Sequence, residues 1–173
     1  LIAIEAAPPA GGWKVFYPEN FGREGLFIKI QAVFVKLLGT EPWVLRLPAA
    51  IFGLLTVLGL YLMASELFSG RVALFASFFL ATSFWHIMFS RIGFRAIMAP
   101  FFLVWSFYFL FLGMRKSKQL LFVLAGLIFG LGFHTYIAFR IAPIIALLPL
   151  WKFYRDYKSE LVKNCAPCAI GLF

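Results

Sequence analysis

The stretch LPAAIFGLLTVLGLYLMAS, residues 47–65, carries no charged side chain and decides the fold class. Its apolar run is unbroken, whereas the strands of a membrane barrel alternate apolar and polar side chains. About 20 such residues are enough for a helix to cross the hydrocarbon core of a bilayer, where backbone polar groups need internal partners. Residues 47–65 therefore predict a transmembrane helix.

The composition extends this prediction to the whole chain. Hydrophobic residues make up 63% of it, charged residues 13%, and the mean hydropathy is +0.93. A soluble domain carries about 25% charged residues, so lipid must cover much of this protein. The net charge of +9 could indicate a nucleic-acid partner. We predict none, because the basic residues separate apolar stretches instead of forming one stripe.

Charged residues also mark the boundaries of the expected spans. The spans are 45–66, 71–88, 97–114, 119–135 and 138–153, with a sixth that begins near residue 164. We therefore predict an all-α, polytopic integral membrane protein.

The first 43 residues are more polar and contain a different kind of helix. In segment 24–38, Lys29 and Lys36 lie two helical turns apart, and apolar residues fill most of the other positions. This pattern predicts an amphipathic helix that lies in the membrane interface; a helix in a soluble loop is the alternative. We divide the chain into an extracytoplasmic loop, 1–43, and a transmembrane helix bundle, 44–173.

The distribution of Lys and Arg predicts the orientation of the bundle. Segments 67–71, 115–118 and 152–163 share one side and are basic, which is typical of cytoplasmic loops. Segment 1–43 and the turns near 86–96 and 134–140 then face outward.

The predicted outer side nevertheless carries many cations, which runs against the usual topology rule. They are Arg23, Lys29, Arg46, His86, Arg91, Arg95, His134 and Arg140. Ionisable groups at membrane depth indicate a functional site, and arginine forks suit a phosphate. Arg91 and Arg95 are four residues apart, so on a continuous helix they would share a face. The alternatives are snorkelling for Arg46 or Arg140 and an interfacial role for His86.

Two further motifs have ordinary explanations. Cys165 and Cys168 form an isolated CxxC without further ligands at metal-binding spacing, so we predict no metal site. Gly126, Gly130 and Gly132 include a GxxxG spacing, which favours close helix packing or, alternatively, dimerisation.

Three stretches of the chain resemble a known family in the same order. They are GTEPWVLRLPAAIFGLLTVLGLYLMASE at 39–66, ATSFWHIMFSRIGFRAIMAPF at 81–101 and GLGFHTYIAFRIAP at 130–143. The chain thereby resembles, over most of residues 20–150, the protein-mannosyltransferase-like glycosyltransferases of family 39. Their bacterial relatives include the aminoarabinose transferases.

The resemblance implies a GT-C fold in the plasma membrane, with an active site on the extracytoplasmic face. Such an enzyme transfers a sugar from a polyprenyl-phosphate carrier to a lipid or protein acceptor, with inversion at the anomeric carbon. Membrane lipids are the other expected partner. No cofactor is expected, and a need for a divalent metal is left open. The implied substrate-binding residues are Arg23, Glu24, Arg91, Arg95, His134, Tyr136 and Arg140.

The chain departs from the family pattern in two places. The family's catalytic Asp stands in the first outer loop, but Asp156 is the only Asp here and lies on the predicted cytoplasmic side. We expect the chain to be part of a longer protein, with the catalytic Asp upstream of Leu1. Relatives also carry Lys-Pro-Pro or His-Pro-Pro before the interfacial helix, where this chain has Arg23 and Glu24.

Two rival functions share these cations. A transporter or flippase for a lipid-linked anion would bind the same phosphate without chemistry. A GT-C polymerase or ligase would differ in its acceptor.

Overall fold

The computed structural model describes residues 16–17, 23–116, 118–145, 147, 151 and 155, with the backbone alone at 16–17 and 23–24. The chain divides into two compact units, Leu1–Phe139 and Arg140–Phe173, which we describe separately. Apart from a two-residue antiparallel ribbon, β1 (Phe16–Tyr17) with β2 (Arg23–Glu24), the described elements are helical. The predicted all-α class is confirmed.

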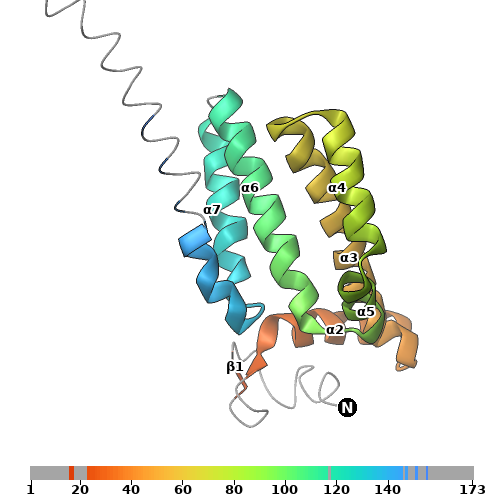
Figure 1. Cartoon of the computed structure of the whole chain (residues 1–173). Helices are drawn as coiled ribbons and strands as arrows, with labels where there is room; N and C mark the ends of the chain where they lie inside the picture. Colours follow the sequence, from red (N-terminus) through yellow and green to blue (C-terminus); the bar gives the residue numbers. More distant parts are fainter. Residues whose placement is uncertain are drawn as a thin grey trace, which may run out of the picture. The chain divides into compact units, whose positions relative to one another are not determined.

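The predicted amphipathic segment is α2, Gly25–Leu38, which packs on α3, Pro42–Leu67. Its buried face includes Phe27 and Ile28. The Gln31 side chain donates from Nε2 to the Leu45 carbonyl at 2.8 Å, which fixes α2 to the first turns of α3. Figure 1 shows α2 crossing the end of α3 and α6. The helix is confirmed, and its position in the interface stays a prediction.

The central pair of helices is α3 with α6, Met98–Lys116. The 26 residues of α3 confirm the predicted span 45–66 and extend about 39 Å at 1.5 Å per residue. A short 3₁₀ helix, η2 (Arg95–Ile97), leads into α6. The indole of Trp105 lies against Gly59, and its Nε1 donates to the Leu55 carbonyl at 3.0 Å.

The predicted span 71–88 is not one straight helix. It consists of α4, Gly70–Thr82, and α5, Phe84–Ile92, with a bend of 55° between them. Ser83 has extended backbone angles, φ −64° and ψ 126°, and its carbonyl accepts from the Ile87 N–H at 3.0 Å. Ser83 is the N-cap residue of α5, although its side chain makes no capping hydrogen bond, and its extended backbone separates the two helices. The expected turn at 86–96 is therefore mostly helix.

The next predicted span, 119–135, is shorter than expected. Helix α7 runs from Gln119 to Gly132 and packs on α6, where Ser106 Oγ donates to the Ala125 carbonyl at 3.1 Å. Its 14 residues extend about 21 Å. The expected packing role of Gly126 and Gly130 is wrong for the described residues, because a Cβ added at either position would meet no atom within 4 Å.

Two helical stretches of the described chain are long and apolar enough to cross a membrane, Pro42–Leu67 and Arg95–Lys116. The bent pair α4–α5 would be a third if it forms one span. By length and composition, the described chain is an α-helical membrane protein.

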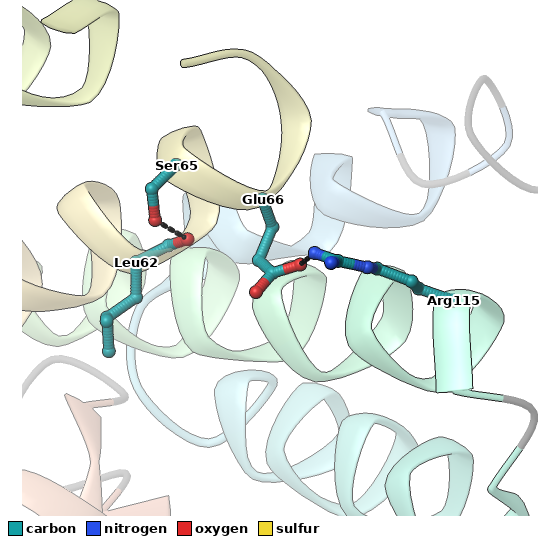
Figure 2. A network of polar contacts seen from close by, with 4 residues as sticks. All are labelled: Leu62, Ser65, Glu66 and Arg115. Carbon is teal, nitrogen blue, oxygen red and sulfur yellow. Dashed lines mark hydrogen bonds and ion pairs between the residues drawn. The ribbon is translucent and has the colours of Figure 1, made fainter. Parts of the chain in front are cut away.

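The helices alternate in direction, which gives the first unit two ends. We call one the α2 end; it holds α2, the start of α3, the turn at 93–94 and the turn at 133–136. The other is the Glu66 end, where Arg115 of α6 donates to Glu66 of α3 at 2.6 Å (Figure 2). For the described residues, the turns at 93–94 and 133–136 lie at the α2 end and the ends of α3 and α6 lie at the other, as predicted. Most of 1–24 and of 152–163 lies outside the described residues, and which end faces the cytoplasm stays a prediction.

The second unit begins within η3, Ile137–Ile141, and continues as helix over 142–145. The predicted span 138–153 is described mainly in this first part. The predicted sixth span near residue 164 and the cysteines at 165 and 168 lie outside the described residues.

Candidate functional site

The turn between α5 and α6 packs directly on the start of α3. Gly93 ends α5 with φ +79°, a left-handed conformation that glycine adopts without steric cost. A Cβ added there would lie 3.4 Å from the Leu45 carbonyl oxygen and 3.5 Å from Arg46 Cα. This close approach brings Arg46 beside the turn that separates Arg91 from Arg95.

Arg95 lies over an aromatic ring from a distant part of the sequence. Its guanidinium carbon is 5.6 Å from the centroid of the Tyr136 ring, within the range of a cation–π interaction. The neighbouring Phe94 makes an edge contact with the same ring at 6.1 Å. Tyr136 thus holds the turn at 93–94 and the cation that follows it.

A compact turn after α7 positions Tyr136. Thr135 is buried, and its hydroxyl donates to the Gly132 carbonyl at 2.6 Å. Gly132 has no room for a Cβ, because the ring of Phe139 packs against its Cα. The backbone therefore folds back at Gly132, which exposes His134 and leaves Tyr136 half-buried under Arg95.

Arg91 does not lie on one helical face with Arg95, so that expectation is wrong. The left-handed Gly93 ends the helix between the two arginines. Arg91 instead lines an open groove of about 300 Å³ between α3, α4 and α5, together with His86 and Ser90. The two arginines therefore lie in different surroundings, Arg91 in this groove and Arg95 over the Tyr136 ring.

The electrostatic balance of the α2 end is strongly basic. Among the side chains described in residues 25–139, Glu41 is the one carboxylate at this end, since Glu66 lies at the other. The cations described there are Lys29, Lys36, Arg46, Arg91 and Arg95, and His134 lies at the same end. Such an excess favours an anionic ligand.

Three predicted site residues are not placed beside Arg95. Arg23 and Glu24 form β2, where the backbone alone is described. Arg140 is exposed and is the first residue of the second unit. Their substrate-binding roles stay predictions.

Sequence reasoning gave Arg46 no place in the substrate-binding set, although its charge at the mouth of a span was evident. It also overlooked Gly93. The sequence RIGFR, residues 91–95, does hold the missing signal, because a glycine directly after an apolar helical stretch favours a helix end. The contact between Tyr136 and Arg95 has no short-range signal, because 41 residues of sequence separate them.

The described residues contain no group of three His, Cys, Asp or Glu side chains that could hold a metal ion. The site in the first unit is therefore defined by cations and aromatic rings. Together, fold and site define an α-helical membrane protein with a basic, aromatic-lined site at one end of its helices.

The chain belongs to the family of dolichyl-phosphate-mannose-protein mannosyltransferases, whose model matches residues 26–172. It is also similar to a protein of Bacillus subtilis (strain 168) named "Putative mannosyltransferase YkcB", with 28% identity over 144 residues. The match covers 82% of this chain and 20% of that relative, so the chain spans about a fifth of the relative's length. No solved structure matches the chain.

Proposed function

We propose that the full-length protein is a membrane glycosyltransferase of the GT-C type. It takes a sugar, with mannose as the first candidate, from a polyprenyl-phosphate carrier and transfers it to a lipid or protein acceptor. The family match over residues 26–172 supports sugar transfer. The observation that carries the donor assignment is the placement of Arg95 over Tyr136 at the end of an apolar helix bundle, in the turn whose Gly93 packs against Arg46.

This arrangement suits a phosphate on a lipid for two reasons. Arg95 lies over the Tyr136 ring, and its planar guanidinium group has the geometry to form two parallel hydrogen bonds to a phosphate. The neighbouring helices α3 and α6 are apolar along their length and would accommodate lipid beside a phosphate at the α2 end. We place this end on the extracytoplasmic face of the plasma membrane.

The proposed reaction is an in-line displacement at the anomeric carbon of the sugar. The acceptor hydroxyl oxygen forms the new bond to C1 while the bond from C1 to the phosphate oxygen breaks. A carboxylate, which the family resemblance places upstream of Leu1, takes the hydroxyl proton as general base. Arg95 and Arg46 stabilise the charge that develops on the departing polyprenyl phosphate. This scheme uses no cofactor. The assay described next also tests whether the reaction needs a divalent metal.

The experiment that tests this function compares two donors for the full-length protein in detergent. We expect sugar transfer from radiolabelled polyprenyl-phosphate mannose and none from GDP-mannose at the same concentration. Addition and removal of a chelator tests the metal in the same assay. Transfer from GDP-mannose alone would contradict the lipid-linked donor. Uptake of the lipid-linked sugar into vesicles without any transfer would favour the transporter.

A further inference from the structure

Two open grooves along α5 form a second site, apart from Arg95 and Tyr136. The first groove, about 300 Å³, has apolar walls that include Leu54 and Val57 of α3 and Ala81 of α4. The second, about 350 Å³, lies along α5 and is lined by Phe84, Met88 and Ile92. The two grooves share Ile87 and Arg91. A single cation thus stands at the junction of two apolar grooves.

The polar side chains near Arg91 already form hydrogen bonds within the protein. His86 Nε2 lies 3.1 Å from the Gly53 carbonyl oxygen and donates to it. Ser90 Oγ donates to the His86 carbonyl at 2.7 Å, and it packs so closely on Gly53 that a Cβ there would overlap it. These contacts fix α5 against α3.

Arg91 itself has no such partner. Within residues 23–116 and 118–145, no ion pair or hydrogen bond engages its guanidinium group, and the side chain is exposed. Its five N–H donors are therefore available to an anion, which would form charge-assisted hydrogen bonds with them.

The charged and the apolar parts of the site lie one after the other along the axis of the bundle. Helix α5 runs antiparallel to the start of α3, because His86 is beside Gly53 while Gly93 is beside Arg46. Arg91 therefore lies toward the α2 end, and the groove walls at Leu54 and Val57 lie deeper along α3. If a lipid head group bound Arg91, its acyl chains would extend from the α2 end toward the middle of α3. This is the direction expected for a lipid in the leaflet at the α2 end.

We propose that Arg91 binds the phosphate diester of a bilayer glycerophospholipid, with one acyl chain in each groove astride Ile87. Two grooves that meet at one cation match a lipid with two chains and one phosphate. A polyprenyl phosphate has one chain and would leave one groove empty. This site is separate from the proposed donor site, and its test does not depend on sugar transfer.

The test is lipid retention by the full-length protein, measured by native mass spectrometry. The protein is exchanged from nanodiscs made of equal parts phosphatidylglycerol and phosphatidylcholine into detergent. We expect one tightly held phosphatidylglycerol on the wild type. Arg91→Gln should lower its retention by about tenfold or more, which corresponds to about 1.4 kcal/mol of binding free energy.

Two further variants separate lipid binding from folding and from bulk charge. Leu54→Trp fills one groove without a change in charge, and Leu54 is 73% exposed, so the larger ring costs little packing. It should also lose the lipid. Arg71→Gln removes another exposed arginine, from the start of α4 and outside both grooves, and should retain the lipid. Equal retention in wild type, Arg91→Gln and Leu54→Trp would overturn the proposal.

A competition arm identifies the source of the phosphate. A polyprenyl phosphate added in excess should leave the bound phosphatidylglycerol in place. Its displacement from the wild type would overturn the assignment to a bilayer lipid and would move Arg91 into the donor site. Because no sugar is transferred in this assay, a failure of the glycosyltransferase proposal leaves the result intact.

Discussion

At the Glu66 end of the bundle, Arg115 donates to a carboxylate oxygen of the same chain at 2.6 Å, as Figure 2 shows. At the α2 end, Arg46 and Arg91 form no ion pair with any described residue. Both ends are basic, but among the described residues Arg46 and Arg91 lack the paired carboxylate that Arg115 has. The difference indicates two uses of arginine in one bundle. Arg115 joins two helices, whereas Arg46 and Arg91 are available to an anion from outside the described residues.

The largest expected difference between the two ends appears when one arginine is removed from each. Arg95→Ala should slow sugar transfer by the full-length protein by about a hundredfold, because losing about 3 kcal/mol of charge stabilisation has that effect on a rate. Lysine at position 95 should rescue the rate only in part, since a point charge does not reproduce a bidentate fork. Initial rates at matched amounts of folded protein provide the measurement.

Arg115→Ala is the matched control for this prediction. It removes an arginine from the other end of the stretch Arg95–Lys116, and that arginine pairs with Glu66 and not with a substrate. Its transfer rate should stay close to that of the wild type. Equal losses in the Arg95 and Arg115 variants would show that the two ends do not differ in function.

The comparison also assumes that α3 and α6 pack tightly between the two ends. A substitution at Gly59 tests this packing. A Cβ at Gly59 would lie 2.9 Å from Trp105 Nε1, so Gly59→Ala must displace the indole that bonds to α3. We expect a loss of about 1–3 kcal/mol in the free energy of unfolding, as is typical of overpacking. Thermal or denaturant unfolding in detergent measures it.

Gly126→Ala supplies the comparison for Gly59, because both glycines lie inside apolar helices. Gly126 faces open space within the described chain, and alanine favours helix formation over glycine. Its unfolding free energy should stay unchanged or rise slightly. A loss as large as that of Gly59→Ala would mean that another part of the protein packs on this face of α7.

These positions also show how far the sequence predicts the structure. The uncharged stretch 47–65 predicted α3 almost to its ends, because a helix that crosses lipid must be both apolar and long. The bend at Ser83 was missed, since apolar residues continue on both sides of it and hydropathy does not detect a local change in ψ. The pairing of Arg95 with Tyr136 depends on how α6 and α7 pack, which no local pattern encodes.

A smaller effect should separate the ring of Tyr136 from its hydroxyl. If Tyr136 positions Arg95 through its ring, Tyr136→Phe should retain most activity, while Tyr136→Leu should raise KM for the lipid-linked donor. A cation–π interaction contributes about 0.5–2 kcal/mol, so a change of roughly 2- to 30-fold is expected. A purely structural role would instead lower the stability of both variants without a selective change in KM. Loss of activity in Tyr136→Phe would assign the role to the hydroxyl.

The smallest effect should come from the ion pair at the Glu66 end. Arg115 is 70% exposed, so water screens its attraction to Glu66 and both side chains lose conformational freedom when they pair. A double-mutant cycle with Glu66→Gln and Arg115→Gln should give a coupling free energy below about 1 kcal/mol. The coupling should also fall as salt is added, because exposed charges are screened within about 10 Å at 0.1 M ionic strength. A coupling well above this limit, unchanged by salt, would mean that the pair is shielded from water in the full-length protein. The Glu66 end would then also be covered by a part of the protein beyond the described residues, and its arginine could no longer serve as the solvent-exposed reference for the α2 end.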